Sequence, residues 1–141
     1  MQGQLSIKVV DDKGLVVSEE TVKNLILNTA FDKIVGLLGN LGTGYVNRIQ
    51  VGTGSASPVA GDTTMQLPIS PTITVSASVS TTSITFTGNL AYNQAIGFSI
   101  SEAGLLTNDG TLVARTTFSP KTKTNRYVFY FTWVVGMKPS S

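Results

Sequence analysis

The side chains that could perform acid–base chemistry in this chain are two adjacent carboxylate pairs, Asp11-Asp12 and Glu19-Glu20. The sequence contains no histidine and no cysteine, so the commonest general base, the usual thiol nucleophile and the preferred zinc ligands are absent. Paired carboxylates catalyse only where their surroundings push the two pKa values apart. Since the first pair lies in a predicted turn and the second at a predicted helix start, we expect no enzyme activity and no cofactor.

Two further patterns have a possible link to ligands. The run Gly52-Thr53-Gly54-Ser55-Ala56-Ser57 begins like a dinucleotide-binding loop, but serine replaces the third glycine and no helix follows, so we interpret it as a loop between strands. A calcium site built from Asp62, Glu102 or Asp109 stays open, although no run has the alternating oxygen ligands of an EF-hand.

The charge pattern argues against nucleic-acid binding. The net charge is +2, and the closest approach to a basic patch is Lys121, Lys123 and Arg126, which we expect to be solvated in a polar loop. No stretch reaches the roughly 20 apolar residues that a membrane span needs. The N-terminus also lacks a basic region followed by an apolar one. We therefore expect a soluble protein made in the cytoplasm, with no membrane partner.

The composition favours a building block. Charged residues make up 13% of the chain, about half the fraction in an ordinary soluble domain. A surface so poor in charge is usually covered by a partner or built from Ser/Thr-rich strands, so an assembly subunit and a small soluble β domain both remain open. The length of 141 residues, with no linker and no internal repeat, predicts one domain over residues 1–141.

The N-terminal third predicts a hairpin followed by a helix. Alternation over residues 4–10 and a second apolar run at 15–17 flank a turn at 11–14. Ser18 then offers an N-cap oxygen, and the apolar residues between Val22 and Leu38 recur mostly at three- and four-residue steps. We expect that helix to end at Gly39 and the glycine-rich residues 42–44.

From residue 45 the apolar period changes from 3.6 to 2, which predicts strands. The ranges are 45–51, a half-buried hairpin over 72–86, then about 96–106, 111–118 and 127–135, with a turn at Asn108-Asp109-Gly110. If that turn is tight, Glu102 and Arg115 become direct or diagonal neighbours, and we predict a structural ion pair, with contact to a partner as the alternative. The fold class is therefore mainly β: an antiparallel β-sandwich with one helix in the N-terminal half.

The last strand is apolar on both faces, which is typical of a strand covered on both sides. Tyr127, Phe129 and Trp133 share one face, and Tyr130 belongs to the other. One interpretation is a central core strand under the helix. The other places one face in a subunit contact, where aromatic side chains supply much of the binding energy.

The order of several short motifs resembles small virion proteins of tailed bacteriophages. The motifs are Asn24-Leu25-Ile26-Leu27-Asn28-Thr29, Val46-Asn47-Arg48-Ile49-Gln50-Val51-Gly52-Thr53-Gly54, Ser101-Glu102-Ala103-Gly104-Leu105 and Leu112-Val113-Ala114-Arg115-Thr116-Thr117-Phe118. Among these proteins, the chain looks most like jelly-roll capsid decoration (cement) proteins. The resemblance implies a jelly-roll-like sandwich on the capsid surface of the virion, bound across neighbouring copies of the major capsid protein.

On this basis we expect a capsid decoration protein that stabilises the head, as a homo-oligomer (dimer or trimer). We expect subunit contacts through Tyr127, Phe129, Tyr130 and Trp133, and through an N-terminal strand that adds to a neighbouring sheet. One alternative is a tail-fibre or baseplate subunit, which predicts few copies per particle. Another is a carbohydrate-binding module, which predicts aromatic rings on a solvent-open face.

Overall fold

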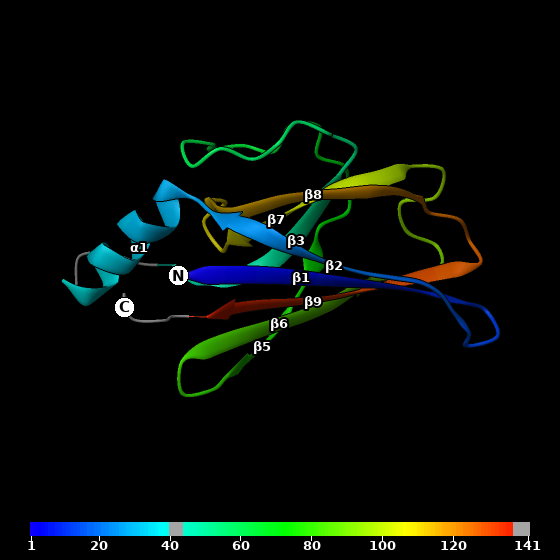
Figure 1. Ribbon diagram of the computed structural model, residues 1–141, viewed down its shortest axis with the longest axis horizontal. Coiled ribbons are helices and arrows are strands. Elements are labelled where there is room, and N and C mark those ends of the chain that lie inside the picture. Colours follow the sequence, from blue (N-terminus) through cyan, green and yellow to red (C-terminus); the bar gives the residue numbers. More distant parts are fainter. Residues whose placement is uncertain (40–43, 137–141) are drawn as a thin grey trace.

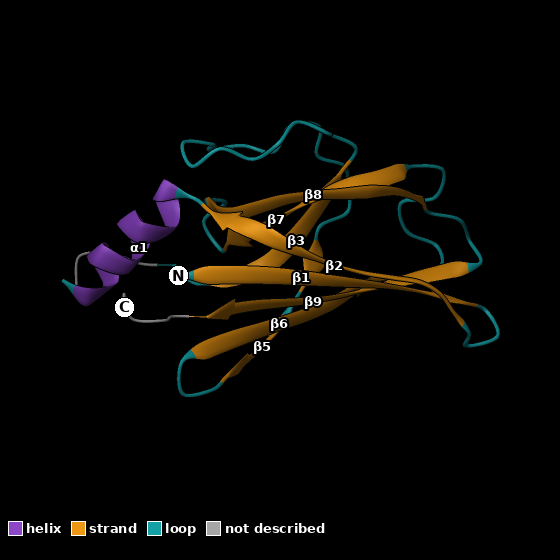
Figure 2. Cartoon of the chain, viewed as in Figure 1, coloured by secondary structure: helices purple, strands orange, loops and turns teal. Residues whose placement is uncertain are grey.

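A computed structural model describes residues 1–39 and 44–136 of the chain (Figure 1). Within these residues the fold is mainly β, with antiparallel strands and one helix, which confirms the predicted fold class (Figure 2). In chain order the elements are β1 (Gln2–Asp11), β2 (Val16–Ile26), α1 (Asn28–Leu38), β3 (Val46–Gly52), β4 (Ile73–Thr74), β5 (Ser76–Val79), β6 (Ser83–Leu90), β7 (Ser99–Thr107), β8 (Leu112–Thr122) and β9 (Tyr127–Gly136).

The strands form one sheet that folds back on itself into two layers (Figure 1). Neighbouring strands follow the order β4-β3-β7-β8-β2-β1-β9-β6-β5, and each pair is antiparallel. Strand β2 joins the layers, because it pairs with β1 up to Asn24 and then with β8 through Leu25 and Ile26. On the opposite side the chain passes from β4, paired with β3, to β5, paired with β6. The result is a sandwich that is nearly closed into a barrel.

The predicted N-terminal hairpin is confirmed, but the predicted helix start at Ser18 is wrong. Ser18 lies in β2 opposite Val9 of β1, and the helix begins only at Asn28, after an extended Leu27. Pairing with β1 over Gly3–Val10 outweighs the local capping preference of Ser18, since tertiary contacts routinely override propensity. The helix ends before Gly39 as predicted, whereas residues 42 and 43 lie outside the described part of the chain.

Helix α1 covers one end of the sandwich and packs mainly on β8 (Figure 1). The Thr29 hydroxyl donates a hydrogen bond to the Leu112 carbonyl at 2.5 Å, and the Lys33 ammonium lies 2.5 Å from the Asp109 carboxylate in the β7–β8 turn. Ala30 is the buried residue of the helix. The helix is therefore anchored by its first two turns, and its apolar residues further along remain at the surface.

Strand β9 lies between β1 and β6, so it is central in the sheet. Phe129, Phe131 and Trp133 point into the core and are fully buried. On the outer face Val128 is buried, but the expectation that both faces are covered is wrong at Tyr130 and Thr132, which are exposed. No element of the described chain lies over this part of the sheet, because α1 packs on β8 instead.

The predicted hairpin over residues 72–86 is present as β4, β5 and β6, but β5 is not half-buried. All four of its residues, Ser76 to Val79, are exposed. The alternation of Ala77 and Val79 with serines predicted a strand correctly. Burial required a covering element, and none of the described residues provides one at this position.

Candidate functional site

The densest polar cluster of the molecule is built around Glu102 on β7 and Arg115 on β8. Arg115 pairs with Gly104, so Glu102 is its diagonal neighbour on the same face of the sheet. The Arg115 Nε and Nη2 atoms lie 3.2 and 3.1 Å from the same Glu102 oxygen, Oε2. Both residues are buried, with exposed fractions of 0% for Glu102 and 3% for Arg115. The structure thus contains the ion pair that the sequence predicted.

Both side chains also bind the long loop between β3 and β4. Glu102 accepts hydrogen bonds from the backbone N–H groups of Gly54 (3.1 Å), Gln66 (3.2 Å) and Leu67 (2.7 Å). Arg115 donates to the Asp62 carboxylate at 3.1 Å and to the Ala56 carbonyl at 2.8 Å. The pair therefore fastens this loop onto the outer face of β7 and β8.

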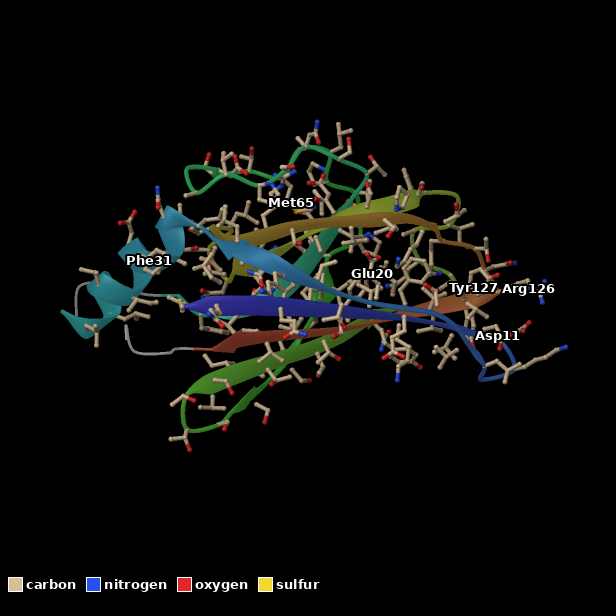
Figure 3. All side chains as sticks on the ribbon, viewed as in Figure 1. Asp11, Glu20, Phe31, Met65, Arg126 and Tyr127 are labelled. Carbon is tan, nitrogen blue, oxygen red and sulfur yellow. The ribbon has the colours of Figure 1, made fainter. Side chains whose placement is uncertain are left out.

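The loop closes a second apolar cluster beneath it. Met65 belongs to the loop (Figure 3), and its buried side chain packs with Leu27, Leu106 and Leu112. Because the loop covers the outer face of β7 and the main core covers its inner face, every residue of β7 after Ser99 is buried. A loop of this length is usually exposed and mobile, and here the Glu102–Arg115 pair and the small cluster hold it in place.

The glycines of the Gly52-Thr53-Gly54 run are required by Glu102, not by a phosphate. A Cβ atom on Gly52 would lie 2.5 Å from Glu102 Oε1, and one on Gly54 would lie 2.6 Å from the same oxygen. Real Cβ atoms do not approach that closely. This close approach agrees with the interpretation of the run as a loop between strands.

The cluster has the chemistry of a structural anchor. Its carboxylate accepts two guanidinium and three backbone hydrogen bonds, which leaves no open position toward solvent. Within residues 1–39 and 44–136, no group of three acidic side chains is arranged to hold a metal ion. Of the calcium candidates, Asp62 and Glu102 share Arg115, whereas Asp109 lies in the β7–β8 turn beside Lys33.

The two carboxylate pairs, Asp11-Asp12 and Glu19-Glu20, lie in different surroundings. The backbone N–H group of Leu15 lowers the pKa of Asp11, which lies at the end of the molecule opposite α1 (Figure 3). Burial raises the pKa of Glu20, but hydrogen bonds from Lys121 and Ser119 lower that pKa by a larger amount. The net shift of the Glu20 pKa is therefore downward. Each of these two carboxylates therefore stays charged near neutral pH and has a structural partner.

The basic residues near the C-terminal hairpin are not all solvated, so that expectation is wrong for Lys123. Its exposed fraction is 0%, and its ammonium donates to the carbonyls of Thr124 (3.0 Å) and Tyr92 (3.4 Å). Burial lowers the pKa of Lys123. Lys121 binds Glu20 at 2.6 Å, and only Arg126 of the three is well exposed.

The four aromatic residues expected at a subunit contact have different positions. Phe129 and Trp133 have exposed fractions of 0%, and the Trp133 indole donates to the Asn24 side-chain oxygen at 3.0 Å, so neither can touch a partner. Tyr127 is partly buried against the core near Arg126 (Figure 3). Tyr130 is 43% exposed on the outer face of β9. Only Tyr130 remains well placed for a surface contact.

The N-terminal strand cannot add to a neighbouring sheet. Strand β1 pairs with β2 on one side, over Gly3–Val10, and with β9 on the other, over Gln2–Asp11. Both of its hydrogen-bonding edges are occupied, which corrects the expectation from the sequence. The free edges of the sheet belong to β4 and β5, at the two ends of the strand order.

An apolar cavity of about 620 Å³ opens between α1 and the β5–β6 hairpin. Ala30, Ile34 and Leu37 of the helix form one wall, and Ala77 and Val79 of β5 form another. The charged side chain in its lining is that of Lys33, which is bound to Asp109. Hydrogen bonds from the Lys33 ammonium and from the hydroxyls of Thr107 and Thr111 lower the pKa of the Asp109 carboxyl. Because the charge of Lys33 is paired with that of Asp109 and the side chains of these two walls are apolar, the cavity suits apolar contacts.

The outward side of α1 is apolar as well. Phe31, Val35 and Leu38 have exposed fractions of 45, 69 and 84%. Their spacing of four and then three residues places them on one side of the helix, and we call them the α1 stripe. Phe31 lies on the helix at the end of the molecule (Figure 3). The periodicity between Val22 and Leu38 predicted one apolar face, so this second apolar side was not predicted.

No helix in the described part of the chain is long and apolar enough to cross a membrane. Comparison with known proteins finds no matching family model, no matching curated protein and no matching solved structure.

Proposed function

We propose that this chain is a structural subunit of a tailed-phage virion, a decoration protein that binds the outer shell of the head. The motif order over residues 20–135 supports this proposal through its resemblance to such proteins. The saturated Glu102–Arg115 anchor supports it further, because it serves rigidity rather than turnover.

The observation that carries the proposal is the α1 stripe. The apolar side of a surface helix normally packs on the core, and α1 does pack Ala30 and Ile34 against the cavity, but it also leaves Phe31, Val35 and Leu38 in solvent. Burying each of these side chains yields about 1.5–3 kcal/mol before the losses of association. Such a stripe fits into an apolar groove of a partner, as amphipathic helices do.

The proposed partner is the major capsid protein, contacted where neighbouring subunits meet. A ligand that binds only the assembled shell stabilises that shell by mass action. Many copies of the chain, as homo-oligomers on the capsid surface, would then reinforce the head against the pressure of its DNA.

A sedimentation assay tests this contact. Heads from a phage that lacks the gene are mixed with the purified chain and pelleted. We expect the wild-type chain to pellet with the heads and Leu38→Glu to bind at least about tenfold more weakly, a loss of about 1.4 kcal/mol. Leu15→Glu is the matched control, because Leu15 is also exposed, at 62%, but lies in the hairpin at the opposite end.

Equal binding of the two variants would reject the α1 stripe, and absence of wild-type binding would reject the decoration function. Gel densitometry of purified virions separates the tail-fibre or baseplate alternative. Decoration predicts copy numbers comparable to those of the major capsid protein, and a tail component predicts only a few copies per particle.

Carbohydrate binding is a second candidate, and Tyr130 is the observation in its favour. This half-exposed ring borders a hollow lined by hydroxyl and amide side chains, among them Thr74, Thr87, Asn89 and Gln94. Sugars bind to such combinations of an aromatic face and polar groups. A glycan array on which the wild-type chain binds and Tyr130→Ala does not would support this candidate, and an array negative at high protein concentration would count against it.

A further inference from the structure

Strand β5 is an unpaired edge of the sheet. Within the described part of the chain it is the last strand in the pairing order and pairs only with β6, and all four of its residues are exposed. The strand lies along one margin of the molecule, below β6 in Figure 1. Its outer side is therefore open to another chain.

The direction of its backbone groups follows from the hairpin. The Ser80 N–H group donates to the Ser83 carbonyl at 2.8 Å, which closes the turn toward β6. In an antiparallel pair, successive residues direct their backbone N–H and C=O groups alternately toward the partner strand and away from it. The backbone groups of Ser78 and Ser76 therefore also point toward β6, whereas those of Ala77 and Val79 point away from it. Val75 continues the alternation and donates to the Asn47 carbonyl of β3 at 3.1 Å. After Val75, the side of β5 that points away from β6 has no strand partner among the described residues.

Apart from its length of four residues, the edge carries none of the features by which proteins normally protect such strands. Edge strands are commonly blunted by lysine, proline or a bulge. Strand β5 contains no proline and no charge, and its pairing with β6 is regular. The whole stretch from residue 63 to residue 101 contains no Asp, Glu, Lys or Arg. Nothing in this region would repel a second strand.

We propose that β5 pairs with β5 of a second copy of this chain, antiparallel, about a two-fold axis at Ser78. In this register Ala77 of each copy lies opposite Val79 of the other, and each such pair exchanges both of its outward backbone hydrogen bonds. The inference rests on the proposed function, because it names the contact that forms the homo-oligomer. The α1 stripe remains free for the shell.

Two observations favour a second copy over an unrelated strand. First, the backbone N–H and C=O groups of Ala77 and Val79 that point away from β6 can bind those of Val79 and Ala77 in a second copy rotated about Ser78. Second, two uncharged edges can meet without burying a charge. A stable contact also needs about 800 Å² from each partner, roughly a tenth of the 7709 Å² surface of this chain. Pairing of four residues is too small alone, so we include the apolar cavity rim beside β5, with Val79 (77% exposed), Tyr45 (67%) and Leu37 (50%).

Sedimentation velocity over a dilution series tests the contact. We expect the wild-type chain to be a dimer that dissociates on dilution. Ala77→Pro should be monomeric at each concentration, because it removes an outward N–H group and leaves the bonds to β6 intact. Ala77→Ser, which keeps that N–H group, is the matched control and should dimerise like the wild type. A monomeric wild-type chain, or a dimeric Ala77→Pro variant, would overturn the proposal.

A cysteine pair tests the register without depending on the proline variant. The chain has no cysteine, so Ser78→Cys introduces a lone thiol. At the proposed axis the two Ser78 Cα atoms would lie about 4.5 Å apart, within disulfide range, whereas two Ser76 residues would be separated by four positions along the strand. We expect Ser78→Cys to oxidise to a linked dimer and Ser76→Cys to stay largely monomeric. Equal cross-linking of both would overturn the register.

These measurements use the purified chain alone, so they separate the two proposals. A chain that pellets with heads but never dimerises would reject only the β5 contact. A chain that dimerises as expected but ignores heads would reject only the decoration function.

Discussion

Arg115 reaches diagonally across the β7–β8 pair to Glu102, and the two side chains meet at 3.1 Å with almost no exposure to solvent. The diagonal position needs two features: a three-residue turn, Asn108-Asp109-Gly110, in which Gly110 has a φ of +87° and the Thr107 N–H group donates to the Thr111 carbonyl, and a register shift between Leu105 and Leu106 that brings Arg115 opposite Gly104. Together the two charges hold the loop between β3 and β4. Glu102 binds this loop at Gly54 and at Leu67, and both residues are more than thirty positions from Glu102 in the sequence.

Removal of Arg115 should strongly destabilise the fold. Arg115→Ala leaves Glu102 buried without its cationic partner, and breaking a buried pair in this way costs about 3–5 kcal/mol. The free energy of unfolding from urea titration measures this loss. Arg126→Ala is the control, since Arg126 is 65% exposed and its nitrogen lies 4.0 Å from Asp12, so it should change stability by less than about 1 kcal/mol. Similar losses in both variants would contradict the structural role of the pair.

A methyl group on Gly54 should displace the loop. The Cβ atom of Gly54→Ala would approach Glu102 Oε1 to 2.6 Å, and overpacking of this kind costs about 1–3 kcal/mol. Limited proteolysis should cut the loop of this variant faster than that of the wild type. Gly61→Ala lies in the same loop with nothing within 4 Å of the added atom, so its cleavage rate should match the wild type. Equal rates in all three proteins would argue against the close approach.

Acid should weaken the attachment of α1 through Asp109. The pKa of Asp109 is lowered from 3.8 in the folded chain, so this residue contributes stability above pH 3.8 that is lost as the pH falls through its folded value. Asp109→Asn should therefore have a lower Tm than the wild type at neutral pH, with the difference shrinking in acid. Asp11 and Glu20, whose pKa values are also lowered, are present in both proteins, so the difference isolates Asp109. A Tm difference that is the same at all pH values would contradict this prediction.

The aromatic residues of β9 should divide into core and surface by mutation. Phe129→Ala should destabilise the chain by about 3–5 kcal/mol, because Phe129 is fully buried. Tyr130→Ala, its neighbour on the outer face, should cost far less, within the range of about 1 kcal/mol typical of surface sites. Chemical denaturation measures both. Fluorescence of Trp133, the sole tryptophan, should be shielded from iodide in the native state. Strong iodide quenching would place β9 at the surface instead.

Some parts of the fold follow from neighbouring residues alone. Leu5, Ile7 and Val9 alternate with polar residues, and the strand that they predict is β1, with these three side chains in the core. The Asn108-Asp109-Gly110 turn also depends only on local stereochemistry, and it brings Glu102 and Arg115 near each other. The register shift between Leu105 and Leu106 then places both side chains on one face of the sheet. Local periodicity and turn chemistry are short-range effects, so they can be recognised without knowing the rest of the chain.

The sequence by itself therefore determined that this chain is an antiparallel β protein with one helix, and which residues turn inward on its most regular strands. Only the tertiary structure decided that residues 18–24 extend β2 along β1, that the loop around Gly54 covers β7, and that the described residues leave the α1 stripe and the β5 edge open. The reason is physical: an apolar period shows that a face can be buried, but the segment that covers it comes from a distant part of the chain. Where no segment of residues 1–39 and 44–136 arrives, as at Leu38 and Val79, the same pattern leaves a surface for another molecule.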